Sequence, residues 1–101
     1  MADEVRWGII GTGKIARAFA TALKDTPGAV LTAVGSRRMD SALAFGADFA
    51  MPDRACYGSY DEVANAADVG IVYIGTPHPM HAENALMALN GGKAVLCEKP
   101  F

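Results

Sequence analysis

The stretch GTGKIA, at residues 11–16, decides how this chain folds. Before it, the mostly apolar run VRWGII at residues 5–10 stops abruptly at Gly11, as a buried strand does at a tight turn. After it, apolar side chains recur at helical spacing, at Ile15, Phe19, Ala22 and Leu23. The sequence therefore predicts a strand, a glycine-rich turn and a helix in direct succession.

Each small residue of this G-x-G-x-x-A pattern has a physical task when the turn stands between a strand and a helix. Gly11 permits the sharp turn, Gly13 lets a pyrophosphate approach the backbone without meeting a Cβ, and Ala16 keeps the helix close to the strand. The backbone N–H groups expected to face the phosphates belong to Thr12, Gly13, Lys14 and Ile15. A turn needed only for packing is the alternative, but its place after the first strand favours a dinucleotide site.

The rest of the chain repeats the alternation of strand and helix. Further strands are predicted at residues 29–36, 55–57, 69–77 and 94–97, and further helices at 40–49, 60–66 and 79–89. Such alternation implies parallel pairing through right-handed crossovers, with helices on both faces of the sheet. We therefore predict a doubly wound α/β fold of the Rossmann type, in three layers, with five strands in the order 3-2-1-4-5.

Three local patterns refine this prediction. Asp40 is a plausible N-cap for the second helix. Ser59 and Glu62 have the spacing of a capping box, in which each side chain satisfies the backbone N–H of the other residue. The last helix is expected to bury one apolar face, formed by Ala82, Ala85, Leu86 and Leu89.

The carboxyl ends of parallel strands line the crevice where such folds bind ligands. The positions expected there are Gly11, Ser36, the turn made of Gly75, Thr76, Pro77 and His78, and the pair Glu98 and Lys99. An NAD site usually has an acidic residue near the end of the second strand, about 20 residues beyond the glycines. Here that end carries Ser36, Arg37 and Arg38 instead, so a 2′-phosphate would meet a hydroxyl and two guanidinium groups. This favours NADP, with NAD possible, unless the two arginines are simply solvated.

Composition excludes several other classes of function. The formal net charge is −2 without a basic stripe, which argues against nucleic acid as a partner. No apolar run is long enough to span a membrane, and the acidic N-terminus is unlike a signal peptide, so a cytoplasmic location is expected. Cys56 and Cys97 lack paired spacing, so neither a metal site nor a disulfide is predicted.

Five motifs in order resemble one family. GIIGTGKIA, AVGSR, YGSYDEV, VYIGTPHPMH and GGKAVLCEKP together resemble the N-terminal half of the Gfo/Idh/MocA oxidoreductases, and the likeness covers essentially the whole chain. The last three motifs are most similar to the branch of dimeric dihydrodiol dehydrogenases and NADP-dependent D-xylose dehydrogenases. The resemblance implies transfer of hydride between NADP and a sugar, polyol or cyclic diol, in an enzyme that is a homo-oligomer.

The resemblance also implies roles for particular residues. The E-K-P segment puts Glu98, Lys99 and Pro100 beside the nicotinamide, with Lys99 as the catalytic residue that hydrogen-bonds the reacting oxygen. The turn from Thr76 to His78 contacts the cofactor, and His78 stands where most of the family has asparagine; His81 is expected to be structural. The alternatives are a solvated charge pair at residues 98 and 99 and a surface turn at His78.

Members of this family are considerably longer than 101 residues. Residues 1–101 are accordingly expected to be a dinucleotide-binding domain that stops before its last helix and strand. The substrate domain, with the general base and the oligomer interface, would be absent, so this chain alone would not turn over. The open alternative is a stand-alone, non-catalytic module that binds nucleotides or another protein. If truncation leaves the strand at residues 94–97 unpaired at the sheet edge, self-association is expected through this edge or through the uncovered helix-packing face beside it.

Overall fold

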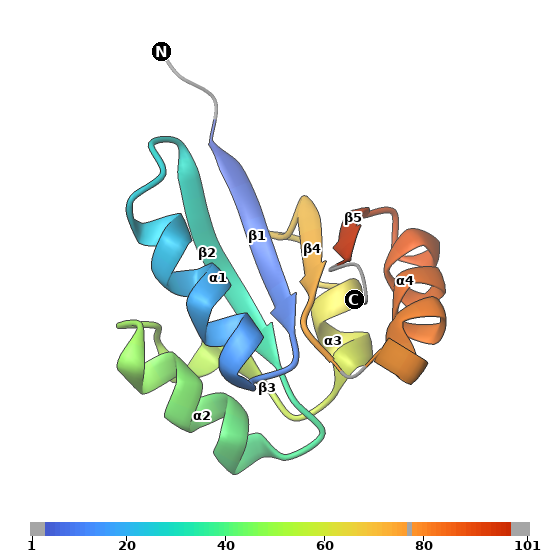
Figure 1. Cartoon of the computed structure of the whole chain (residues 1–101), viewed down its shortest axis with the longest axis horizontal. Helices are drawn as coiled ribbons and strands as arrows, with labels where there is room; N and C mark the ends of the chain where they lie inside the picture. The colour runs from blue at the N-terminus through green and yellow to red at the C-terminus, as the bar shows by residue number, and fades with distance from the viewer. Residues whose placement is uncertain (1–3, 77, 98–101) are drawn as a thin grey trace.

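One parallel sheet organises the computed structural model, which describes residues 4–76 and 78–97 (Figure 1). Within these residues the sheet has five strands in the order β3-β2-β1-β4-β5, and every neighbouring pair is parallel. The strands are β1 (Val5–Ile10), β2 (Ala29–Gly35), β3 (Cys56–Tyr57), β4 (Ile71–Ile74) and β5 (Ala94–Cys97). The predicted fold class and strand order are confirmed.

Helices connect the strands as right-handed crossovers require. They are α1 (Lys14–Lys24), α2 (Met39–Asp48), α3 (Tyr60–Ala64) and α4 (His81–Asn90), with 3₁₀ turns η1 (Asp53–Ala55) and η2 (His78–Met80). The last helix begins two residues later than predicted because η2 occupies the residues before it.

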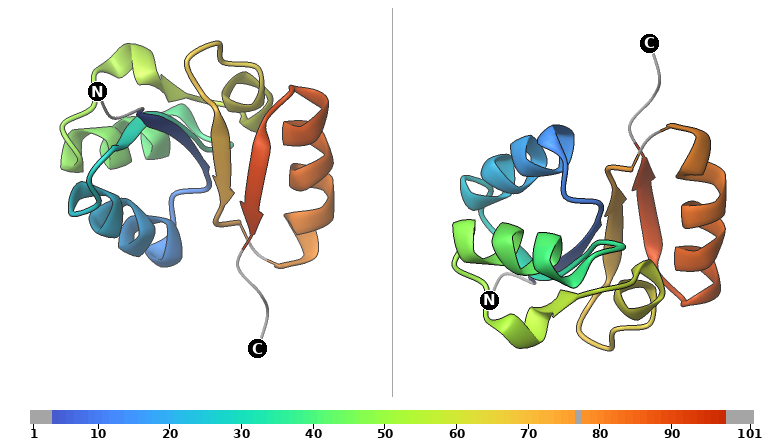
Figure 2. Two further views of the ribbon diagram at one scale, coloured as in Figure 1. Left: turned by 90° about the horizontal axis from the view of Figure 1, so that it is seen from above. Right: turned by 90° about the horizontal axis from the view of Figure 1, so that it is seen from below.

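The two faces of the sheet carry separate cores. Neighbouring residues of a strand point to opposite faces, so Ile9 of β1 shares a core with Ala16 of α1 and Phe45 of α2. Ile10 instead shares a core with Val63 of α3 and Ala88 of α4. α1 and α2 therefore cover one face and α3 and α4 the other, in the three-layer arrangement that Figure 1 and Figure 2 show.

An aromatic stack ties α1 to the middle of the sheet. Phe19 of α1 lies parallel to Tyr73 of β4, with ring centroids 3.8 Å apart, and Trp7 of β1 meets Phe19 edge-on at 4.9 Å. Such pairs add roughly 0.5–1.5 kcal/mol each beyond the apolar area that they bury. They help to fix the helix that follows the glycine turn.

The start of α2 differs from the prediction. Arg38, with an extended backbone, occupies the N-cap position, and Asp40 lies inside the first turn. The Asp40 carboxylate accepts hydrogen bonds from the Arg38 guanidinium and from the Ser41 N–H. The prediction that Asp40 caps the helix is wrong, because the neighbouring arginine engages its side chain.

Ser59 caps α3 as predicted, since its Oγ accepts a hydrogen bond from the Glu62 N–H. The reciprocal half of the capping box differs, because the Glu62 carboxylate accepts from the Ser59 hydroxyl, at 3.0 Å. The helix ends at Ala64, two residues before the predicted end.

The predicted buried face of α4 is wrong for its two leucines, although Ala85 packs against the core. Leu86 and Leu89 are 61% and 56% exposed, whereas Asn84 and Ala88 are buried. The rotation of the helix follows from its contact with α3, where a Cβ on Gly91 would lie 2.1 Å from the Ala64 carbonyl oxygen. So close an approach allows only small side chains between the two helices, and the leucines face outward.

Ala50 offers a test of backbone strain at the end of α2. It adopts a left-handed conformation, with φ of 58°, while the Met51 N–H bonds the Gly46 carbonyl, as in a Schellman motif. Glycine is favoured at that position, so Ala50→Gly should raise the free energy of unfolding by about 0.5–1 kcal/mol. Urea denaturation measures the change. Ala47→Gly, an exposed position inside the same helix, is the control and should lower stability by a similar amount; a loss in both variants would contradict the strain at Ala50.

Candidate functional site

Three turns meet at the carboxyl edge of the sheet. The Gly11 N–H donates to the Gly35 carbonyl at 2.9 Å, and the Gly75 N–H donates to the Ile10 carbonyl at 2.8 Å. The Ser36 N–H bonds the Tyr57 carbonyl at 3.1 Å. The turns after β1, β2 and β4, predicted from the sequence to share one edge, are therefore joined by backbone hydrogen bonds.

The glycine turn after β1 has the geometry expected of a phosphate-binding turn. Gly11 has φ of 102°, and a Cβ on it would lie 3.0 Å from the Gly75 carbonyl carbon and 3.1 Å from the Thr76 nitrogen. Glycine is therefore required there by both conformation and space. A Cβ on Gly13, in contrast, would meet no atom of the described residues within 4 Å. Gly13 thus borders open space that a ligand can occupy. A side chain at residue 13 would take up part of that space.

The N-terminus of α1 opens onto that space with free hydrogen-bond donors. The first helical bond runs from the Arg17 N–H to the Gly13 carbonyl, so the N–H groups of Lys14, Ile15 and Ala16 have no acceptor within the helix. Gly13 gives no side-chain cap, and the first turn holds no acidic residue. In α3 the equivalent place is filled by Ser59. The donors and the helix dipole at α1 suit an anion.

The two arginines in the loop after β2 have different surroundings, a difference that the sequence did not indicate. Arg38 forms a two-fold ion pair with Asp40, with N···O distances of 3.1 and 2.8 Å, and both side chains are mostly exposed. The hydrogen bond lowers the pKa of Asp40 and raises that of Arg38. Arg37 is exposed and has no ion pair within the described part of the chain. Ser36 is 9% exposed, and its Oγ accepts from the Arg38 N–H at 3.4 Å.

The turn after β4 is held from α4. The Thr76 hydroxyl donates to Asn84 Oδ1 at 2.6 Å, and the Thr76 carbonyl lies 2.6 Å from His81 Nε2. Because a carbonyl oxygen only accepts, His81 must carry a proton on Nε2. The role expected for His81, a structural hydrogen bond, agrees with this contact. Asn84 was missed by sequence reasoning, because the predicted buried face of this helix did not include its position.

Several predicted site residues lie outside the described residues. These are Pro77, Glu98, Lys99 and Pro100. The backbone of His78 forms the start of η2, directly after this turn.

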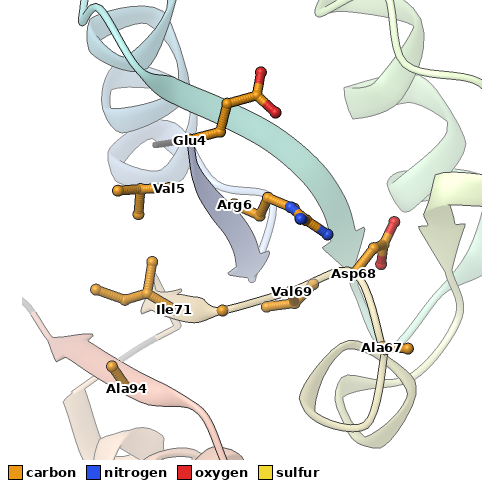
Figure 3. Close-up of a pocket in the computed structure, with 9 residues that line it drawn as sticks. Glu4, Val5, Arg6, Ala67, Asp68, Val69, Ile71 and Ala94 are labelled. Atoms are coloured by element: carbon orange, nitrogen blue, oxygen red, sulfur yellow. The ribbon is translucent and has the colours of Figure 1, made fainter. Parts of the chain in front are cut away.

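The described residues also line a pocket far from the glycine turn. A pocket of about 490 Å³ lies at the opposite, amino end of the sheet, between the starts of β1, β4 and β5 (Figure 3). Its lining mixes charged and apolar side chains and includes Glu4, Val5, Arg6, Asp68, Ile71 and Ala94. None of the predicted site residues lines this pocket.

The described residues form neither a metal-binding cluster nor a membrane-spanning helix. Among the described residues, no three metal-ligating side chains come together. None of the described helices has the length and hydropathy needed to cross a bilayer.

Comparison with known proteins agrees with this geometry. Residues 5–101 match the model of the GFO_IDH_MocA family, described as an oxidoreductase family with an NAD-binding Rossmann fold. The chain belongs to the Gfo/Idh/MocA oxidoreductase family. The resemblance inferred from the five motifs is thereby confirmed.

Curated relatives in the Gfo/Idh/MocA family include trans-1,2-dihydrobenzene-1,2-diol dehydrogenases. Those of mouse and cattle are each 43% identical to this chain over 99 residues, which is 96% of this chain and 29% of the relative. The chain thus spans less than a third of the length of these enzymes.

Solved structures of the family superimpose closely on the described fold. KijD10, a 3-ketoreductase from Actinomadura kijaniata solved with NADP, has a TM-score of 0.89 at 36% identity, over 97% of this chain and 31% of that one. The scyllo-inositol dehydrogenase of Lactobacillus casei has a TM-score of 0.87 at 26% identity, over 97% of this chain and 29% of that one.

The two glycines of the turn should respond differently to the same substitution. Gly11→Ala should lower the free energy of unfolding by at least about 2 kcal/mol, because it combines a disfavoured φ with a clash against backbone. Gly13→Ala should cost less than about 1 kcal/mol, because the added Cβ enters open space. Urea denaturation of both variants tests this, and equal losses would contradict the described turn.

Proposed function

We propose that residues 1–101 form the NADP-binding domain of an oxidoreductase. The observation that carries the proposal is the uncapped N-terminus of α1, which opens beside the empty space over Gly13. Three backbone donors and a helix dipole fit a pyrophosphate, and the N-cap residue Gly13 provides no side chain that competes for them. The fit rests on this chain's own residues: Gly11, Thr12, Gly13, Lys14 and Ile15 would hold the phosphates.

The loop after β2 would hold the adenosine ribose. Ser36 stands where an NAD site usually has a carboxylate, and Arg37 offers an exposed guanidinium without an ion pair among the described residues. Arginine suits a phosphate because its planar fork donates two hydrogen bonds at once. The related KijD10 structure contains NADP, which supports the same choice here, with NAD as the weaker ligand.

The proposed reaction is the exchange of a hydride between NADP and a sugar, polyol or cyclic diol. Oxidation of such a substrate moves the hydride from the alcohol carbon to the nicotinamide and releases the hydroxyl proton, which leaves a carbonyl. The Lys99 ammonium would hydrogen-bond the reacting oxygen and stabilise its negative charge, while Glu98, Gly75, Thr76, Pro77 and His78 would position the cofactor. The diol dehydrogenases and the 3-ketoreductase among the relatives support this substrate class.

The larger assembly is part of the same proposal. A substrate domain would follow this one in the parent protein and supply the general base, because the relatives are more than three times as long as the matched segment. We further propose that the parent is a cytoplasmic homo-oligomer with no nucleic-acid or membrane partner, as the sequence suggests.

Isothermal titration of the chain with NADPH and with NADH tests the cofactor assignment. We expect NADPH to bind at least tenfold more tightly, which corresponds to about 1.4 kcal/mol. Gly13→Ala should weaken both ligands, because its Cβ fills the space proposed for the pyrophosphate. Tighter binding of NADH would overturn the NADP assignment, and binding of neither ligand would favour a module without a nucleotide.

The Asp40 carboxylate should lower the affinity for a 2′-phosphate, because its negative charge neutralises the neighbouring Arg38 guanidinium. Asp40→Asn should therefore tighten NADPH binding roughly threefold to tenfold at low salt, with NADH unchanged, and the gain should shrink as salt rises. The control is Asp61→Asn, which removes the same charge from the first turn of α3. An equal gain in that control would show a general charge effect rather than release of Arg38.

A further inference from the structure

Asn84 of α4 is buried at a cost that packing does not explain. Its side chain is 1% exposed, and its Nδ2 has no hydrogen-bond acceptor within the described residues. A buried amide without a partner is destabilising, and asparagine also has a low helix propensity. The neighbouring buried position on the same helix, Ala88, is apolar. An apolar side chain at residue 84 would avoid the cost.

Among the described residues, the asparagine adds a hydrogen bond to Thr76. Asn84 Oδ1 accepts from the Thr76 hydroxyl at 2.6 Å, and Thr76 is itself only 6% exposed. His81, three residues earlier and on the same side of the helix, meets the Thr76 carbonyl at 2.6 Å. The start of α4 thus holds Thr76 by its side chain and by its backbone.

The position of Thr76 matters because this turn touches the phosphate turn. A Cβ on Gly11 would lie 3.1 Å from the Thr76 nitrogen, so the two backbones are already near their closest approach. A small shift of Thr76 would therefore either press on Gly11 or open a gap beside it.

The strand order places Thr76 on one particular side of the glycine turn. β2 and β4 flank β1 on opposite sides. A dinucleotide lies across the point where the strand order reverses, so if its adenosine half occupies the Ser36 loop, its nicotinamide half occupies the Thr76 side. We propose that Asn84 is a positioning residue for the nicotinamide half of the site, acting through Thr76. This inference rests on the function proposed above.

Titration with two ligands separates this role from general support of the fold. NADPH contains both halves of the cofactor, whereas adenosine 2′,5′-bisphosphate lacks the nicotinamide half. Asn84→Ala should raise the Kd of NADPH at least fivefold and leave that of the bisphosphate within twofold. Asn90→Ala, the same substitution at an exposed position of α4, is the matched control and should change neither.

Variants of Thr76 test the hydrogen bond itself. Thr76→Val has nearly the same shape but no hydroxyl and should reproduce the Asn84→Ala effect, whereas Thr76→Ser, which keeps the hydroxyl, should lose less affinity for NADPH than Thr76→Val. If the two residues act through one bond, the double variant Thr76→Val/Asn84→Ala should lose no more affinity than either single variant. Thr76→Val also serves as the test if Asn84→Ala does not fold.

The outcomes separate the two proposals. Equal weakening of both ligands, or of neither, would overturn the role of Asn84 while the cofactor site stands. If the unmodified chain binds neither NADPH nor the bisphosphate, the proposed function fails, and this inference fails with it.

Discussion

The close backbone contact between the turn after β1 and the turn after β4 is the constraint on which the rest of the site depends. Gly11 can lie against Gly75 and Thr76 only because it lacks a Cβ and adopts a positive φ. That approach lets the Gly75 N–H donate to the Ile10 carbonyl, so the pairing of β1 with β4 continues to the carboxyl ends of both strands. Gly75 in turn leaves room for Ala16, whose Cβ would lie 3.1 Å from a Cβ at that position. The N-terminus of α1 is thereby directed at the crevice.

The N-termini of α1 and α3 differ in whether a side chain caps them. α3 is capped by Ser59, whose Oγ accepts from the Glu62 N–H, so at least this orphan donor is satisfied within the protein. α1 has no side-chain cap and opens at the crevice, which leaves its donors available to an anion. Side-chain charge is divided in a similar way, since Arg38 is paired with Asp40 while the adjacent Arg37 projects without an ion pair among the described residues. Backbone dipoles and one exposed guanidinium together supply the positive potential.

α4 shows how one short helix can serve both the core and the site. Its small residues pack against α3 and the sheet, and its polar residues His81 and Asn84 hold the turn after β4. Both tasks require the same side of the helix, and this leaves Leu86 and Leu89 exposed. The Nδ2 of Asn84, which has no acceptor in the part of the chain that the structure describes, is the energetic cost of combining them.

The sequence by itself determined the order of strands and helices, the parallel sheet and the glycine turn, because these follow from local periodicity and from the conformational freedom of glycine. It also brought Gly11, Ser36 and Thr76 to one edge, since the carboxyl ends of parallel strands always meet there. It did not determine which face of α4 is buried, because leucine and alanine positions at helical spacing allowed more than one rotation. Nor did it reveal that Asp40 pairs with Arg38 or that Asn84 bonds Thr76. Those contacts depend on distances between side chains, which only the packing of α3, α4 and the sheet decided.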